Sequence, residues 1–476
     1  ARLQTNIALN RDAAEVDEQI SRIIALAENY RNQIPEERAS RSFFSSQQDI
    51  YDIAVDNSFR RARYEEAYNY LEISNSRSLL NWLKKGVSIK NEKEKIKEIE
   101  VIFNENAQPL PLAEIRARMP EGVQILQYAV LENKVLLWLV SKDDFHHTVT
   151  EIEAEKLSEK IKAYTELVSA QDDKKQEEAK RLAAELYDLL IRPVADRLDA
   201  ARQICVIPHK ALFNLPFAAL TSADGNPFLK QFNFFYAPSA NVFLLFTEDA
   251  RRKSAAAEAD ESLLSVGNPH FDRSSGSEFK NLRDLPKAEV EALEIVPLYA
   301  ADSKSLLGKA ATESALQNSL GSAEVIHFAG HYMVRDGEPL ASGLLLTRDE
   351  NGDKPDDGIL TNAELISRKM PQARLVVLSA CRTGVEQYYD GEGMVGLSRT
   401  FLAAGAPLVV ASHWQVDSGA TAVLMKDFHS FRRREKLSTT AALRRAQLKM
   451  LESADPRLRQ PYYWAAFAAY GGYAEF

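Results

Sequence analysis

Cysteine is scarce in this chain: only Cys205 and Cys381 occur among its 476 residues. Two cysteines so far apart in the sequence are too few for a disulfide framework or for a metal site made of four thiolates. Their scarcity favours a reducing compartment in which thiols stay reduced, and we therefore expect a cytoplasmic protein.

Basic charge and long apolar runs are lacking as well. The chain has 59 Lys and Arg residues against 68 Asp and Glu residues, a net charge of −9. A protein that binds nucleic-acid backbones needs a basic face, so we expect no direct nucleic-acid partner. No stretch approaches the ~18 uninterrupted apolar residues of a membrane span. No signal-peptide core follows Ala1, and the absence of an initial methionine predicts a fragment or a trimmed chain.

What is present is the composition of a folded protein. Apolar residues make up 45% of the chain and charged residues 27%, and the length suits about three domains or two large ones. Residues 1–110 show helical spacing. One helix face collects the following apolar residues: Val16, Ile20, Ile23, Ile24, Ala27 and Tyr30. The charge-rich run Lys90–Glu100 also predicts a solvated helix.

The remaining sequence alternates between strand and helix patterns. Residues 123–130 and 135–140 predict a hairpin, followed by a helix pair and a strand at 204–207. Beyond residue 255, helix-length segments separate four short apolar runs: 263–266, 325–329, 375–378 and 407–411. This spacing indicates a parallel sheet covered by helices on both faces. We expect two α/β units after the helical start.

Two of the predicted strands end in reactive side chains. His331 follows the strand 325–329, and Cys381 follows the strand 375–378. The carboxyl ends of neighbouring parallel strands meet at one edge of a sheet, so the imidazole and the thiol would converge there. A histidine can take the proton of a thiol and later protonate a leaving amine, which is the chemistry of cysteine peptidases.

A plainer interpretation of these residues stays open. A lone cysteine after a strand is commonly just a small buried hydrophobe. Cys205, which lies inside the strand 204–207, fits that role well, and His327 is expected in the core. A rival motif, Gly391–Gly396, matches G-x-G-x-x-G and is followed by a strand and Asp417, as in dinucleotide sites.

Two observations count against a dinucleotide site. The glycines come a full loop after the preceding strand, and Asp390 and Glu392 would place negative charge where a pyrophosphate must sit. We interpret the segment as a tight helix start instead. P-loop, zinc-protease, nucleophile-elbow and paired C-x-x-C motifs are absent from the sequence, so we expect no cofactor and no metal.

An ordered series of motifs gives the sequence a family resemblance. The series consists of His327–His331, Pro339–Ser342, Leu344–Leu346, Gly358–Thr361, Leu375–Gly384, Gly391–Gly393, Phe401–Ala406, Val410–Asp417 and Tyr463–Phe467. It resembles the CHAT domain, the caspase-like peptidase family related to separase. Ile207–Leu220 and Tyr236–Ser239 extend the similarity upstream, so that it covers roughly residues 110–476. The start, notably Ala67–Leu83, is similar to the tetratricopeptide-like helices that often precede such domains.

The resemblance implies a caspase-like α/β fold with an N-terminal α-helical region. Residues 1–110 would form the tetratricopeptide-like or regulatory region, and residues 111–255 an inactive, pseudo-caspase half. Residues 256–476 would form the active half, with mostly parallel central sheets flanked by helices. Family enzymes are soluble and intracellular, need no metal for the chemistry and are often activated by a partner.

The resemblance also assigns roles to single residues. Cys381 matches the nucleophile and His331 the general base and acid, and the backbone amides of Cys381 and Tyr332 would form the oxyanion hole. Many members have glycine where this chain has Tyr332, whose Cβ restricts the backbone. Asp417 lies where related peptidases carry an acid that binds basic substrate residues; alternatively, it caps the helix that begins near Gly419.

The favoured hypothesis is a cysteine endopeptidase that cleaves a protein substrate through an acyl-enzyme intermediate. A partner or ligand, acting through the N-terminal helices, would activate it. The alternative is a catalytically silent caspase-like scaffold or signalling module, which the intact Cys381 and His331 disfavour.

Overall fold

The computed structural model describes most of the chain. The described residues are 13–33, 48–75, 77–85, 87–91, 99–103, 108–171, 175–256, 260–271, 273, 279–335, 337–349, 356–380, 387–389, 393–415 and 417–476. The chain divides into two compact units: Ala1–Ala117 with Tyr389–Gly393, and Arg118–Tyr388 with Met394–Phe476. Cys381 lies outside the described residues, as do Asp390, Gly391 and Glu392.

The first unit is mostly helical, as the sequence predicts. Its elements are α2 (Ala13–Gln33), α4 (Gln48–Arg60), α5 (Tyr64–Ser74), α6 (Arg77–Lys85), β1 (Val87–Asn91) and β2 (Ile99–Phe103). The apolar face of α2 packs on α4, where Ile20 and Ile24 join Tyr51 in one core cluster. The prediction for Tyr30 is wrong, because this side chain is 55% exposed at the end of α2.

The predicted helix at Lys90–Glu100 is also wrong at both of its ends. Lys90 and Asn91 belong to β1, and Ile99 and Glu100 belong to β2. The two strands pair in antiparallel register, with Lys90 opposite Glu100. The β-branched residues that flank the charge run favour extended backbone and decide the outcome there. Residues 92–98 lie outside the described part.

The second unit is built on one eleven-stranded sheet. Its strands, in spatial order, are β5 (Phe145–Glu151), β4 (Lys134–Val140), β3 (Val123–Val130), β6 (Gln203–Ile207), β7 (Asn233–Tyr236), β18 (Phe467–Gly471), β17 (Leu408–Ser412), β14 (Leu375–Ser379), β10 (Val325–Ala329), β8 (Leu263–Gly267) and β9 (Lys304–Leu307). We call β5, β4, β3, β6 and β7 the first half of the sheet. The second half consists of β17, β14, β10, β8 and β9. The sheet is mixed and mostly parallel.

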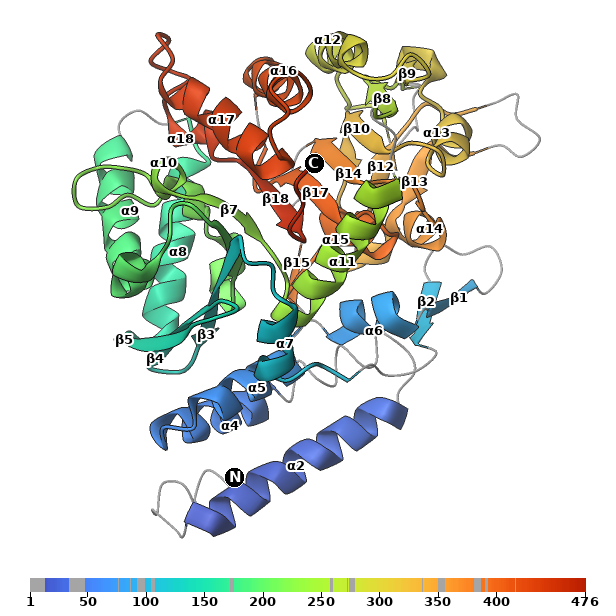
Figure 1. The fold of residues 1–476 in the computed structure, drawn as a ribbon. Coiled ribbons are helices and arrows are strands. Elements are labelled where there is room, and N and C mark those ends of the chain that lie inside the picture. The colour runs from blue at the N-terminus through green and yellow to red at the C-terminus, as the bar shows by residue number, and fades with distance from the viewer. Residues whose placement is uncertain are drawn as a thin grey trace. The chain divides into compact units, whose positions relative to one another are not determined.

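Helices cover this sheet, as expected. They are α8 (Ala154–Val168), α9 (Gln176–Leu190), α10 (Phe228–Gln231), α11 (Ala240–Ala256), α12 (Pro286–Ile295), α13 (Glu313–Ser319), α14 (Asn362–Ser367), α15 (Leu397–Ala403), α16 (Ser418–Arg434), α17 (Thr439–Leu451) and α18 (Pro461–Trp464); α7 (Leu112–Arg118) precedes them. Figure 1 shows α12 and α16 along one side of the second half, with α17 beside β7 and β18, and α11 and α15 along the other side.

The strands that the sequence predicts are confirmed. The hairpin is β3 with β4, the strand 204–207 is β6, and the four runs after residue 255 are β8, β10, β14 and β17. These four strands are parallel to one another. The carboxyl ends of β10 and β14 therefore lie at the same edge of the sheet.

The sequence does not reveal how the two halves join. The late strand β18 lies between β7 and β17, antiparallel to β17. At its end Gly471 has a φ of 137°, and a Cβ there would collide with the carbonyl oxygen of Pro407. Only glycine suits this position, because it combines a left-handed backbone with a close approach.

Two small sheets remain, and the second of them includes Tyr389 and Gly393, which are grouped with the first unit. One consists of β11 (Tyr332–Met333), β12 (Gly343–Leu345) and β13 (Ile359–Thr361), and the other of β15 (Gln387–Tyr389) and β16 (Gly393–Val395). Short 3-10 helices are η3 (Arg192–Arg197), η4 (Lys210–Asn214), η5 (Phe217–Ala219), η6 (Val296–Leu298), η7 (Gly308–Ala310) and η8 (Pro339–Ala341). Gly396 precedes α15, so a helix does begin directly after the glycine motif.

Candidate functional site

The candidate site lies where β10 and β14 end. The two strands are parallel neighbours, and their last residues, Ala329 and Ser379, lie opposite each other. His331 comes two residues after Ala329, and Cys381 comes two residues after Ser379 in the sequence. Cys381 lies outside the described residues, so its pairing with His331 stays a prediction.

His331 is held by its surroundings in one orientation. The ring is half-buried and lies beside Phe271, with 5.7 Å between the ring centroids. Its Nε2 lies 2.8 Å from the carbonyl oxygen of Arg283. A carbonyl oxygen can only accept, so in the neutral ring Nε2 carries the hydrogen and Nδ1 carries the lone pair. Nδ1 is therefore the atom that can take up a proton.

The residue after the histidine belongs to a small sheet. Tyr332 in β11 pairs with Leu344 of β12, and the amide of Leu345 donates to the carbonyl oxygen of His331 over 3.0 Å. The Tyr332 hydroxyl accepts a hydrogen bond of 2.9 Å from Asn362. These contacts fix the backbone around His331 from both the main chain and the side chain.

A third strand, β17, supports the end of β14. The buried Ser412, the last residue of β17, donates its hydroxyl hydrogen to the carbonyl oxygen of Ala380 over 2.8 Å. Ala380 directly precedes Cys381. Ser412 is not among the predicted site residues, although a lone hydroxyl directly after the apolar run 407–411 is a signal that the sequence offers.

Asp417 lies just before α16 and is exposed. Its Oδ1 accepts a hydrogen bond of 2.8 Å from the amide of Ala420, so Asp417 is the N-cap of this helix. Capping, which the sequence left open as one of two roles, is therefore realised. The cap uses one lone pair of the carboxylate, which keeps further lone pairs that can accept from a substrate group.

The two residues expected in the core are there. Cys205 and His327 are both fully buried, in β6 and β10. The ring of His327 lies between Glu291, 3.0 Å from Nε2, and His429, 3.1 Å from Nδ1. The hydroxyl of Tyr299 lies 2.6 Å from the other nitrogen of His429. Burial, with smaller contributions from His327 and Arg432, lowers the pKa of His429 well below its usual range.

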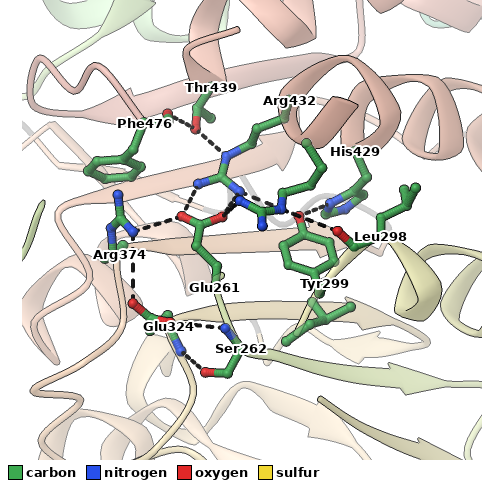
Figure 2. A network of polar contacts seen from close by, with 12 residues as sticks. Glu261, Ser262, Leu298, Tyr299, Glu324, Arg374, His429, Arg432, Thr439 and Phe476 are labelled. Atoms are coloured by element: carbon green, nitrogen blue, oxygen red, sulfur yellow. Dashed lines mark hydrogen bonds and ion pairs between the residues drawn. The ribbon is translucent and has the colours of Figure 1, made fainter. Parts of the chain in front are cut away.

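This buried chain of polar groups continues to the opposite ends of the same strands. Glu261 there forms a two-pronged ion pair with Arg432 and also contacts Arg374 at 3.0 Å and Arg433 at 3.2 Å (Figure 2). Burial by itself would raise the pKa of Glu261, but the three guanidinium groups lower it below its usual value. The residues around Glu261 link the starts of β8 and β14 to α16. They lie at the end of the strands opposite to the edge that carries His331.

Neither a membrane helix nor a metal cluster is found in the part of the chain that the structure describes. No helix there is long and apolar enough to cross a bilayer. No group of three or more His, Cys, Asp and Glu side chains there could hold a metal ion.

Curated relatives share part of the chain. Tetratricopeptide repeat protein 28 of Homo sapiens is 27% identical over 325 residues, which cover 60% of this chain and 13% of that protein. The Mus musculus protein of the same name is 26% identical with the same coverage. The chain thus spans only 13% of the length of the curated relatives it matches.

Solved structures show distant similarity. The separase–securin complex of Saccharomyces cerevisiae matches with a TM-score of 0.48 and 10% identity, covering 77% of this chain and 31% of that chain. The Arg-specific cysteine proteinase gingipain R matches with a TM-score of 0.39 and 10% identity, covering 67% of this chain and 75% of that chain.

The family itself follows from the match to a family model. The CHAT domain model covers residues 180–472, which is more than half of the chain. The matched range begins within α9 and ends directly after β18, so it includes β6 and β7 of the first half and all of the second half. The chain therefore belongs to the CHAT domain family.

Proposed function

We propose that this protein is a cysteine endopeptidase that uses Cys381 as nucleophile and His331 as general base and acid. One observation carries the proposal: β10 and β14 are adjacent parallel strands in register, so the residues that follow them leave the sheet at the same edge. Family membership supports it. An imidazole with a basic Nδ1 at this edge is the partner that a thiol needs to become a thiolate.

The reaction would proceed in two steps. His331 takes the Cys381 proton, and the sulfur attacks the scissile carbonyl carbon to form a C–S bond. The C–N bond then breaks, and the imidazolium gives its proton to the leaving amine. In the second step His331 takes a proton from water, and the resulting hydroxide attacks the thioester carbonyl. The C–S bond breaks to release the carboxylic acid product, and the imidazolium returns its proton to the Cys381 sulfur.

Neighbouring groups would position the reacting atoms. Ser412 fixes the Ala380 carbonyl next to the nucleophile. We propose that the backbone amides of Cys381 and Tyr332 donate to the carbonyl oxygen as it gains charge, an arrangement whose single donors contribute about 3–4 kcal/mol in other enzymes. The β11–β12 pairing would hold the Tyr332 amide in place despite its Cβ. Asp417 would attract a basic side chain of the substrate.

A second candidate is a catalytically silent scaffold. The curated relatives carry the name of a repeat that consists of helices, and their names mention no peptidase activity. In that case the helical first unit would bind a partner, and the CHAT domain would change shape or bind without cleaving. The same helical unit would receive the activating partner if the protein is a peptidase.

A peptide-library cleavage assay tests the proposal. Each variant is incubated with the library at reducing conditions, and new peptide termini are read by mass spectrometry. We expect wild type and Cys205→Ala to cleave alike, because Cys205 is buried inside β6, and Cys381→Ala to lose cleavage. Equal cleavage by wild type and Cys381→Ala would refute the proposal.

A thiol-reactive probe covers the case of a resting enzyme that awaits its partner. An activated thiolate reacts faster than an ordinary thiol. We expect an iodoacetamide probe to label Cys381 rather than Cys205, and His331→Ala to slow that labelling. Labelling of Cys381 at the same rate in wild type and His331→Ala would favour the scaffold.

A further inference from the structure

A pocket of about 560 Å³ lies between the helix pair α8–α9 and the segment 456–462. Neither Cys381 nor His331 is among its described lining residues. Its size is in the range that holds a small organic ligand. Apolar groups from both helices and from the facing segment line much of it: Tyr164, Leu167, Val168, Ala179, Ala183, Ala219 and Pro461. The pocket therefore offers an apolar surface that could cover the body of a ligand.

The charged groups of the pocket all have one sign. Lys175, Lys180, Arg457 and Arg459 line it, and no aspartate or glutamate is among the described lining residues. Such a lining is unusual in a chain whose net charge is −9. A negatively charged ligand would complement the positive charge of this lining.

Two of the four cations make no ion pair with a described residue, although Arg459, after the larger effect of Arg457, helps to lower the pKa of the Asp455 carboxyl. Lys180 pairs with Glu177 at 2.6 Å, and Arg457 pairs with Asp455 at 2.8 Å. Lys175 and Arg459 make no ion pair with any described residue, and the nearest acceptor of Arg459 is the carbonyl oxygen of Ala454 at 3.4 Å. Both side chains are exposed and can turn toward a bound anion.

The start of α9 also borders the pocket, with Glu177 and Glu178 in its first turn. α9 begins at Gln176, which lines the pocket next to Lys175, and it runs for 15 residues. The unpaired amides of a helix N-terminus attract anions. The cationic side chains and the start of α9 thus line the same pocket as the apolar groups.

The opposite wall is anchored by two buried indoles. Trp414 Nε1 donates to the carbonyl oxygen of Tyr462 over 3.1 Å, and Trp464 Nε1 donates to that of Arg459 over 3.0 Å. Tyr462 and Arg459 both line the pocket. Tryptophan fluorescence should therefore respond when this wall is occupied.

We propose that this pocket binds a small organic anion: an apolar, preferably aromatic, body that carries a carboxylate, sulfonate or phosphate group. The apolar part packs between α8, α9 and Pro461. The anionic group pairs with Lys175 and Arg459. The proposal is independent of the peptidase chemistry, since it requires neither Cys381 nor His331.

The probe for the test is 8-anilinonaphthalene-1-sulfonate, an aromatic sulfonate, titrated against the full chain by calorimetry and by tryptophan fluorescence. The double variant Lys175→Glu/Arg459→Glu should bind at least ~10-fold more weakly, as expected when charge-assisted contacts are reversed. The matched control is Lys304→Glu/Lys309→Glu, which makes the same charge change at exposed sites in β9 and η7 and should leave affinity within about twofold.

Folding of the double variant is checked by circular dichroism. A glutamate at position 175 precedes the first turn of α9, where negative charge stabilises a helix, so the fold should persist. A third variant, Ala179→Phe, fills the pocket from a half-buried helix position and should weaken the probe without changing any charge.

Two further ligands separate the parts of the proposal. N-phenyl-1-naphthylamine has the aromatic body without the sulfonate, and inorganic phosphate has the charge without the body. Both should bind more weakly than the probe. Equal binding of the probe to wild type and the double variant, equal loss in the Lys304/Lys309 control, or unchanged binding to Ala179→Phe would overturn the proposal.

Discussion

The two halves of the sheet each carry a histidine two residues beyond the end of a parallel strand, and the two histidines have opposite surroundings. His209 follows β6 and is 2% exposed, with Nδ1 accepting a hydrogen bond of 3.0 Å from the Val130 amide. His331 follows β10, is half-buried and has Nε2 2.8 Å from the Arg283 carbonyl oxygen, so that in the neutral ring Nδ1 carries the lone pair. An equivalent position after a strand is therefore no sign of chemistry by itself.

The difference lies in what each imidazole can do with a proton. Burial, with a smaller contribution from Lys210, holds the pKa of His209 well below its usual range. Its Nδ1 lone pair is already used by the Val130 amide, and its Nε2 is buried without a hydrogen-bond partner among the described residues. The first half thus uses its histidine as a structural acceptor, whereas the second half carries the histidine that we propose as the general base.

The largest expected effect separates the two histidines directly. We expect His331→Ala to reduce peptide cleavage by ~10²–10⁴-fold, the usual contribution of a general acid–base group, with little change in thermal stability. His209→Ala should keep the cleavage rate but lower the free energy of unfolding by about 1–3 kcal/mol, because the Val130 amide loses its partner. Cleavage assays and urea denaturation measure the two effects.

The reverse outcome would remove the contrast between the halves. If His209→Ala, still folded by circular dichroism, lost cleavage as strongly as His331→Ala, the first half would take part in the chemistry.

Next in size is the ion-pair network that supports the second half. Removing the charge of Glu261 by Glu261→Gln leaves Arg374 and Arg432 buried without their shared partner, so we expect a loss of about 3–5 kcal/mol in the free energy of unfolding. The control is Glu294→Gln, which breaks the exposed pair with Lys426 in the same half and should cost less than about 1 kcal/mol. Equal losses for both variants in urea denaturation would contradict the burial argument.

A third prediction concerns substrate preference at the end of β17. Asparagine caps helices about as well as aspartate, so Asp417→Asn should keep α16 and the melting temperature unchanged. If Asp417 also binds a basic substrate side chain, the preference for Lys or Arg should fall by ~10-fold or more, the worth of one charge-assisted contact. Library profiles of the two proteins give the answer; identical profiles would leave Asp417 with its cap alone.

The last prediction is a pH dependence that differs between the halves. Burial, together with Glu364, Asp356 and Asp357, raises the pKa of Glu313 in α13 to about 8. A carboxyl group with a raised folded pKa stabilises the fold fully below its unfolded pKa, and this stability is lost as the pH rises through the folded pKa. We expect wild type to lose stability between about pH 4.5 and 8, and Glu313→Gln to lose less.

His209 should respond with the opposite sign. A histidine with a lowered pKa remains neutral in the fold, so stability falls when the pH drops below about 6.5, the unfolded value. Melting temperatures of wild type, Glu313→Gln and His209→Ala across the pH range test both signs. A parallel shift of wild type and Glu313→Gln at all pH values would contradict the assignment to Glu313.

The regular parts of this fold were accessible from the sequence, because their signals are local. The β-branched runs of β8, β10, β14 and β17 favour extended backbone by themselves. The helices between them predict the parallel pairing. The strand β18 reads Phe-Ala-Ala-Tyr-Gly, which has no β-branched residue, so its place between β7 and β17 is set by packing alone. At Lys90–Glu100 the run of charged residues predicts a helix, although the residues at both of its ends belong to strands.

The site was accessible only in part. His331 and Cys381 could be proposed from the sequence because each follows a strand within a family motif, and their pairing stays a prediction. The Glu261–Arg432 pair could not, since 171 residues separate its members and neither has a local signal. The contact from Ser412 to Ala380 depends in the same way on which strands become neighbours.

The position of β18 has a consequence for the order of assembly. Five strands lie on each side of it in the sheet, and all ten precede it in the sequence. During synthesis, therefore, two five-stranded sheets can form before residues 467–471 leave the ribosome, each with an unpaired strand at its inner edge. Closure of the sheet is a late, long-range event, and ribosome-bound chains that stop before β18 should expose β7 and β17 to pairing with other chains.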